Sequence, residues 1–153
     1  MLRSCALLIL LFTIACSNDP SPAPALRYYE VGLSDFTDER KPAGAEDWRD
    51  TSFVVATADP QLIRKITEQL ALPVTQRQIV NGALTAGNGG YNRNGSHNFK
   101  WHFKEDDWHL TDMSAELLDG RPYSDVDISN AYWVDTVKRF SPWHSYIKRE
   151  IRP

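Results

Sequence analysis

The chain has 153 residues, with 17 Lys and Arg side chains against 20 Asp and Glu, so its formal net charge at neutral pH is −3. This mild acidity, with no basic tail or stripe, lacks the electrostatic signature of nucleic-acid-binding proteins, and we expect no nucleic acid among its partners. The only cysteines are Cys5 and Cys16, both close to the N-terminus. We therefore expect no disulfide, thiol nucleophile or cysteine metal site beyond them.

The first fifteen residues have the zones of an export signal. Arg3 supplies the positive start, Cys5–Phe12 form an uncharged apolar run, and small residues lead to Ala15. The run is too short to cross a bilayer about 30 Å thick as a stable helix. It is therefore interpreted as a targeting segment that is removed, and it takes no part in the fold.

The cysteine that follows the signal predicts a lipid anchor. The order Thr13 to Cys16 resembles a bacterial lipobox, whose cysteine is acylated and becomes the new N-terminus, although Thr13 stands in place of the usual leucine. Residues 16–25, rich in serine and proline, would form an extended tether to the membrane. Ser17 is not acidic, which in such lipoproteins favours the outer membrane of the bacterial cell envelope. The alternative is a secreted soluble protein with an incidental Cys16.

The first folded segments are an extension at residues 26–51 and the start of a domain at 52–153. Arg27–Leu33 suits an edge strand, and residues 34–50 are interpreted mostly as loop. Ser52–Thr57 is a β-branched apolar run typical of a buried strand. Asp59 is suited to an N-cap, with Pro60 at the first helical position. The apolar spacing then predicts a helix over residues 60–71, through Leu62, Ile63, Ile66 and Leu70.

A hairpin is predicted next. Residues 77–85 alternate as a second strand, and the glycine- and asparagine-rich segment 86–98 is interpreted as a plain loop, because its spacing matches no phosphate-binding motif. Residues 99–103 place Phe99, Trp101 and Phe103 on one face. We expect the charged residues 104–107 to turn the chain, and residues 108–118 to return antiparallel, with a bulge near Thr111 and with Met113, Ala115 and Leu117 facing inward.

The C-terminal elements are less determined by pattern. A short helical turn is expected after Pro122, residues 131–140 are left undecided, and residues 142–151 suit either a helix or a strand. Together the segments predict an α+β fold. It consists of a small antiparallel sheet with one main helix, residues 60–71, packed on it, plus short C-terminal elements.

Six motifs in order carry a family resemblance: FVV with DP, GNGGYN, the Trp-His-Phe strand, ELLDGRP, the step Asp125-Val126-Asp127, and Tyr-Trp leading to RFSPWHSYI. This set resembles the N-terminal domain of the calmodulin-binding protein family named for a slime-mould protein of seventy-four kilodaltons. The likeness covers residues 52–151. Calmodulin itself is not an expected partner, because its targets are typically basic amphipathic helices, whereas helix 60–71 carries only two basic side chains and one acidic one.

The resemblance also implies a spatial contact. Where relatives tend to have two cysteines, this chain has Leu118 and Ser141. If those cysteines pair in relatives, Leu118 and Ser141 lie close together here, and packing alone holds this member. Asp127 stands where relatives tend to have a glutamate, so the acid is kept but shortened.

Two constellations suggest metal or hydrolase chemistry. Three histidines suggest zinc, which needs three or four converging ligands; the favoured alternative is partly exposed side chains in an aromatic sheet. Five acids suggest calcium, but they lack the EF-hand spacing, and turn-shaping, capping or solvated roles are favoured. A carboxylate pair, Glu116 with Asp119 or Asp127, would suit a glycosidase. The histidines are His97, His102 and His109, and the acids are Asp112, Glu116, Asp119, Asp125 and Asp127.

The sequence therefore predicts a non-catalytic recognition or accessory domain, tethered to a membrane outside the cytoplasm, that binds a protein or a glycan. The candidate ligand patch contains His102 and Glu116 as hydrogen-bonding groups and Asp119 and Asp127 as acidic partners. No cofactor is expected, and calcium is not favoured. The alternatives are a small metal-assisted or carboxylate-based hydrolase and a calcium-dependent binding module.

Overall fold

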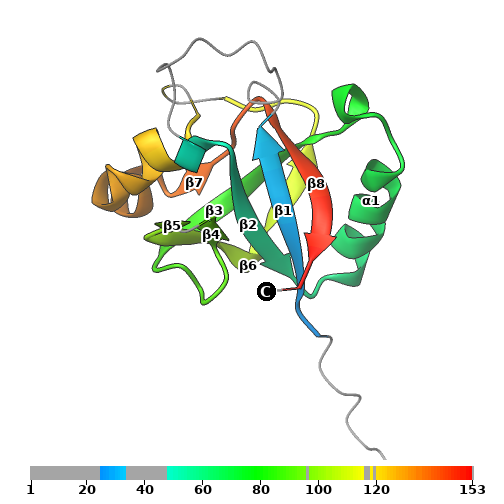
Figure 1. Cartoon of the computed structure of the whole chain (residues 1–153), viewed down its shortest axis with the longest axis horizontal. Helices are drawn as coiled ribbons and strands as arrows, with labels where there is room; N and C mark the ends of the chain where they lie inside the picture. The colour runs from blue at the N-terminus through cyan, green and yellow to red at the C-terminus, as the bar shows by residue number, and fades with distance from the viewer. Residues whose placement is uncertain (1–24, 34–47, 96, 116–117, 119, 153) are drawn as a thin grey trace, which may run out of the picture.

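The computed structural model describes residues 25–33, 48–95, 97–115, 118 and 120–152, which form an α+β fold with two small antiparallel sheets (Figure 1). One sheet has the strand order β2-β1-β8, the other β6-β3-β7, and β4 pairs with β5 in a short ribbon. The strands are β1 (Arg27–Leu33), β2 (Ser52–Thr57), β3 (Ile79–Ala86), β4 (Arg93–Asn94), β5 (His97–Asn98), β6 (Trp101–Thr111), β7 (Arg139–Phe140) and β8 (Ser145–Ile151). The predicted fold class is confirmed.

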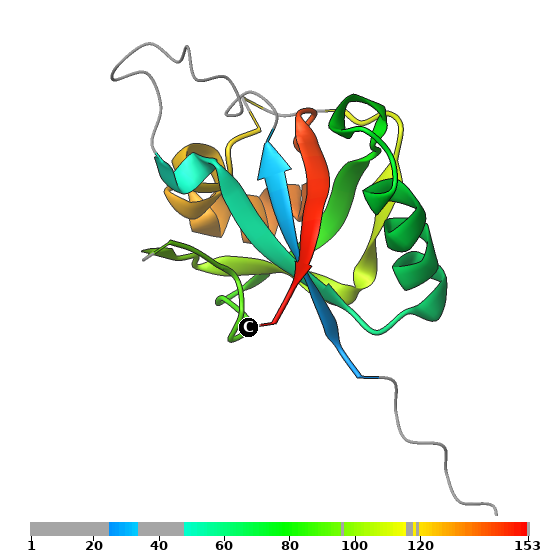
Figure 2. The same ribbon diagram turned by 45° about the vertical axis from the view of Figure 1, so that its right-hand side comes forward.

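Strand β1 is central in its sheet. It pairs antiparallel with β2 on one side and with β8 on the other, and Figures 1 and 2 both show it between them. The prediction of an edge strand for residues 27–33 is therefore wrong. The alternating side chains Tyr29, Val31 and Leu33 are all buried on the inner face. Because β8 comes from the other end of the chain, local sequence gives no sign of this second partner.

The predicted hairpin at residues 99–118 is also wrong, because β6 continues straight through it. Leu84 of β3 pairs with Phe103 and Gly82 pairs with Trp108, so residues 104–107 bulge out between two halves that share one partner strand. The bulge lies there rather than near Thr111. It keeps charged side chains in solvent while the strand returns to the core at Trp108.

Two consequences follow from this single long strand. His102 and His109 lie on the same strand, so they do not face each other across a hairpin. Met113 and Ala115, predicted to face inward, are exposed beyond the end of β6. Leu117 lies outside the described residues.

Helix α1 (Pro60–Leu70) forms as its sequence predicts. The Asp59 side chain accepts a hydrogen bond from the backbone N–H of Gln61 at 2.8 Å, and Pro60 occupies the first turn. Leu62 and Ile66 are buried against the sheets. No helix among the described residues is long and apolar enough to cross a membrane.

The end of α1 is fixed to the outer edge of β8 by one arginine. Arg77 donates to the carbonyl oxygens of Leu70 and Leu72 at 3.2 and 3.0 Å, and to that of Ile147 in β8 at 2.7 Å. One guanidinium therefore satisfies carbonyls that the helix end and the strand edge would otherwise leave unpaired. Figure 2 shows α1 beside β8.

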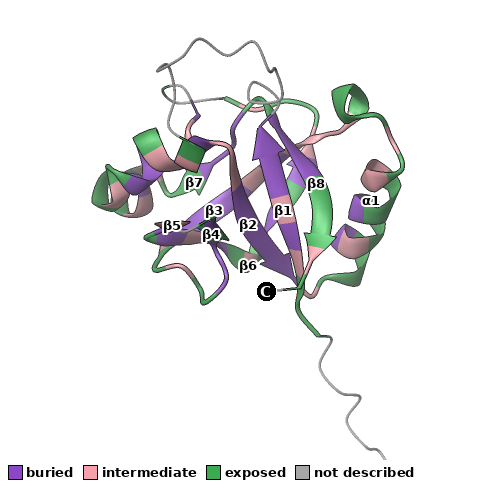
Figure 3. Cartoon of the chain, viewed as in Figure 1, coloured by how far each residue is buried: buried purple, intermediate pink, exposed green. Residues whose placement is uncertain are grey.

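The core is an aromatic cluster between the inner faces of the two sheets, where buried strands predominate (Figure 3). Phe53 of β2 packs on Trp101 and Phe103 of β6, with ring centroids 5.3 and 5.6 Å apart. Phe140 of β7 closes the cluster against Trp133 at 5.6 Å. Burying each such ring contributes roughly 1.5–3 kcal/mol. The predicted inward face of residues 99–103 is confirmed.

The C-terminal segments resolve what the pattern left open. A helix does follow Pro122, and β8 settles residues 145–151 as a strand. The buried carboxylate of Asp50 accepts from the N–H groups of Tyr123 and Ser124 at 2.7 and 2.9 Å, and thereby caps that helix from far away in sequence. The short helices are η2 (Trp48–Asp50), η3 (Val74–Gln76), and the π-helical η4 (Pro122–Asp127) and η5 (Tyr132–Val137).

Candidate functional site

The predicted ligand patch is described at two of its four positions. His102 lies on β6, where its Nδ1 donates to the carbonyl oxygen of Gly87 at 2.6 Å and its ring meets Tyr91 edge-on. Asp127 is 1% exposed and accepts from the backbone N–H of Lys100 at 2.5 Å. Glu116 and Asp119 lie outside the described residues, so the patch as a set stays a prediction.

The second oxygen of Asp127 is also engaged within the fold. It lies 3.2 Å from Nε2 of His97, whose ring packs edge-on against Phe99 and Tyr123. A carboxylate that is buried and bonded on both oxygens supports the loop around it more directly than it could meet a ligand. His102 and Asp127 have no hydrogen-bond partner in common.

The histidines do not gather. His97 pairs with Asp127, His102 bonds to the backbone, and His109 is exposed further along β6. Within the described residues, no three His, Cys, Asp or Glu side chains lie close enough to hold a metal ion. Leu118 is exposed and Ser141 is buried, donating to the carbonyl of Val80 at 3.0 Å; their proximity stays a prediction.

Segment 86–98, predicted as a plain loop, is attached to both sheets by its asparagines. The fully buried Asn92 accepts from the N–H of Val54 in β2 at 2.9 Å and donates to the carbonyl of Trp101 in β6 at 2.8 Å. Asn94 donates to the carbonyl of Ser52 at 2.9 Å. The ribbon β4-β5 is therefore held along the outer edge of β2 by side chains.

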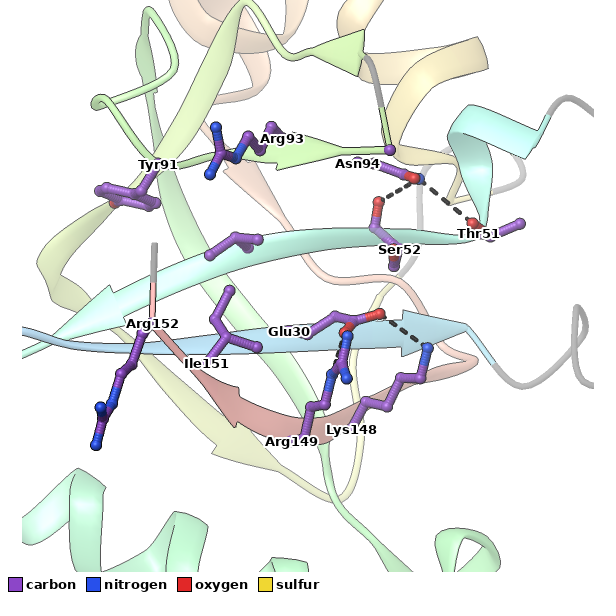
Figure 4. A pocket seen from close by; sticks show the side chains of 12 residues that line it. Glu30, Thr51, Ser52, Tyr91, Arg93, Asn94, Lys148, Arg149, Ile151 and Arg152 are labelled. Carbon is purple, nitrogen blue, oxygen red and sulfur yellow. Dashed lines mark hydrogen bonds and ion pairs between the residues drawn. The ribbon is translucent and has the colours of Figure 1, made fainter.

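This attachment creates the main concavity of the described residues, which we call the basic groove (Figure 4). It is an open channel of about 380 Å³ over the outer face of the sheet β2-β1-β8. The ribbon forms one wall and β8 the other, and β1 and β2 form the floor. Its lining residues are Glu30, Thr51, Ser52, Val54, Tyr91, Arg93, Asn94, Gly95, Lys148, Arg149, Ile151 and Arg152.

The groove is strongly positive in a chain that is negative overall. It contains the four cations Arg93, Lys148, Arg149 and Arg152, and a single acid, Glu30. Neither Arg93 nor Arg152 forms an ion pair with any other described residue. Cations focused in a groove raise the local concentration of anionic ligands.

Glu30 organises one wall of the groove. Its two carboxylate oxygens accept from Nζ of Lys148 at 2.8 Å and from Nε of Arg149 at 2.6 Å. Burial raises the pKa of this carboxyl, but the two hydrogen bonds and the two positive charges outweigh burial and leave the pKa below its ordinary value. Glu30 is therefore ionised at neutral pH, and the four cations are only partly neutralised.

A bulge in β8 explains how two consecutive residues reach the same acid. Glu30 pairs with Arg149, whereas the next residue, Val31, pairs with Ile147, so Lys148 is an extra residue on that strand. In a regular strand neighbouring side chains point to opposite faces, and the bulge removes that alternation locally. Both Lys148 and Arg149 can then bond Glu30 on the outer face, as they do.

Sequence reasoning missed this site. The cations are split between the ribbon and β8, and the expectation of no basic stripe considered only their order along the chain. The available signal was the run Lys148-Arg149 followed by Arg152 in a segment that also alternates as a strand. Without the pairing partner Glu30 in β1, that run is equally compatible with an exposed helix face.

Comparison with known proteins supplies a family. Residues 41–153 match the family model described as the binding-protein-74 N-terminal domain, which covers more than half of the chain. The match confirms the resemblance drawn from the six ordered motifs. It begins after β1, the strand that completes the first sheet. No curated protein and no solved structure gives a significant match to this chain.

Proposed function

The chain belongs to the binding-protein-74 N-terminal domain family, and we propose that this member is a non-catalytic recognition domain whose basic groove binds anionic groups of a protein or glycan. The observation that carries the proposal is the charge of the groove. Four cations line it against one acid, in a chain whose formal net charge is −3. Two of the cations, Arg93 and Arg152, are exposed and unpaired among the described residues, so they are free to meet a ligand.

The same groove favours binding over hydrolysis. A carboxylate-based glycosidase needs two carboxyl groups on either side of the bond that it cleaves. The groove offers only Glu30, whose two oxygens are bonded to Lys148 and Arg149. A calcium site would need several anionic oxygens in one place, and the four cations of this groove would repel the metal ion.

We also propose that the domain works outside the cytoplasm, tethered by acylation of Cys16 to a membrane of the bacterial cell envelope, the outer membrane being favoured. The support is the apolar segment before Cys16 and the Ser- and Pro-rich residues after it. Mass spectrometry of protein from the membrane fraction should find an acylated N-terminal Cys16. Recovery of Cys16→Ser and wild type in equal amounts from membranes would refute the anchor and favour a secreted soluble form.

Binding to a panel of polyanions tests the groove itself. The panel comprises polyglutamate, an oligogalacturonate and a single-stranded oligonucleotide, titrated at low salt. We expect at least one to bind, and the double substitution Arg93→Ala with Arg152→Ala to weaken it at least tenfold. Arg64→Ala, an exposed arginine of α1 outside the groove, is the control and should bind as wild type. Binding that is absent, or indifferent to the double substitution, would refute the proposal.

A further inference from the structure

We infer that the groove takes an acidic oligosaccharide, a chain of carboxylate-bearing sugar rings lying across the outer face of β2-β1-β8. The inference rests on the proposed anion-binding function and adds the class of ligand. It follows from the spacing of the cations, from the state of the sheet edges and from the chemistry of the groove floor.

The cations stand on opposite walls. Lys148 and Arg149 belong to β8, and Arg93 belongs to the ribbon beyond β2 (Figure 4). The strands β8 and β2 are separated by β1, which places them about 10 Å apart at the usual strand spacing. A single small anion cannot reach both walls. The geometry therefore suits an oligomer that carries negative charges on separate units.

A peptide added as an extra strand does not fit, because both edges of this sheet are occupied. On β2, the N–H of Val54 and the carbonyl of Ser52 are bonded to Asn92 and Asn94. On β8, the carbonyl of Ile147 is bonded to Arg77. Strand addition draws its affinity from free main-chain groups at such an edge. An acidic peptide would have to bind here through its side chains alone.

The floor of the groove suits hydroxyl-bearing ligands. Ser52 is half-buried there, and its hydroxyl has no hydrogen-bond partner among the described residues. Arg149 uses only its Nε on Glu30, so its two terminal nitrogens remain free to donate. The lining is mainly polar, with Val54, Tyr91 and Ile151 as its apolar members, too little for the apolar face of an amphipathic helix. Free hydroxyl and guanidinium groups match sugar hydroxyls and carboxylates.

The test compares ligands that share charge but differ in chemistry. The purified protein is titrated at one salt concentration with an oligogalacturonate, its neutral methyl ester, monomeric galacturonate, polyglutamate, a single-stranded oligonucleotide and vesicles containing anionic phospholipid. We expect the oligogalacturonate to bind at least tenfold more tightly than every other probe. Arg93→Ala should weaken it severalfold, and Arg64→Ala should leave it unchanged. Both are exposed side chains, and thermal melting checks that each variant is folded.

Ser52→Ala separates sugar recognition from charge alone. It should weaken the oligogalacturonate severalfold and leave the binding of polyglutamate unchanged. If polyglutamate, the oligonucleotide or the vesicles bind more tightly than the oligogalacturonate, and still depend on Arg93 and Arg152, the ligand class is wrong and the anion site stands. If no probe binds in a way that depends on those arginines, both proposals fail.

Discussion

Asn92 is the single side chain that joins the two sheets, and Asn92→Ala should be strongly destabilising. Its amide accepts from the N–H of Val54 at 2.9 Å and donates to the carbonyl of Trp101 at 2.8 Å, with no exposed surface. Alanine would leave one buried donor and one buried acceptor without partners. Each unsatisfied group costs about 1–3 kcal/mol.

We expect Asn92→Ala to lower the free energy of unfolding by about 2–4 kcal/mol, the lower part of that sum, because water can reach the edge of β2 once the side chain is removed. For a domain of this size the melting temperature should fall by about 10 °C. The substitution should also loosen the ribbon β4-β5, which forms one wall of the basic groove. Ligand affinity and stability should therefore fall together.

Urea unfolding followed by tryptophan fluorescence measures the effect. Asn98→Ala is the matched control, since Asn98 is exposed on the same ribbon and its side chain forms no hydrogen bond with another described residue. We expect the control to change the free energy of unfolding by less than about 0.5 kcal/mol. An equal effect of the two substitutions would refute the role assigned to Asn92.

Two further predictions concern the first sheet. A chain that begins at residue 41, where the family match begins, lacks β1 and should show no cooperative unfolding by circular dichroism, whereas a chain that begins at residue 25 should; equal transitions would contradict the central role of β1. Glu30→Gln should destabilise the fold in a pH-dependent way, because the pKa of Glu30 is lower in the folded state than in the unfolded chain. The difference in unfolding free energy from wild type should be complete at pH 7 and shrink below about pH 4 as the carboxylate takes up a proton; a constant difference down to pH 2 would contradict it.

Sequence alone determined the elements that depend on near neighbours. Asp59, Pro60 and the apolar stripe through Leu62 and Ile66 specify α1, because capping and helical periodicity act within one or two turns. The alternation of residues 99–103 specified a buried face for the same reason. Six motifs in order were sufficient to indicate the family, which the match over residues 41–153 confirms.

Tertiary structure decided everything that depends on a distant partner. Residues 104–107 are charged enough for a turn, but β3 is long enough to pair with both halves of β6, and the segment became a bulge. Residues 27–33 look like an edge strand until β8 supplies a second partner; Arg27 forms an ion pair with Glu150, 123 residues away.

The basic groove shows the same limit most plainly. Arg93 comes to face Lys148 and Arg149 only because Asn92 and Asn94 hold the ribbon on β2 and because a bulge in β8 turns two consecutive side chains to one face. Helix capping and strand alternation are local and can be read along the chain. Strand pairing, bulges and the convergence of charges depend on contacts between residues far apart in sequence, and only the folded chain brings those residues together.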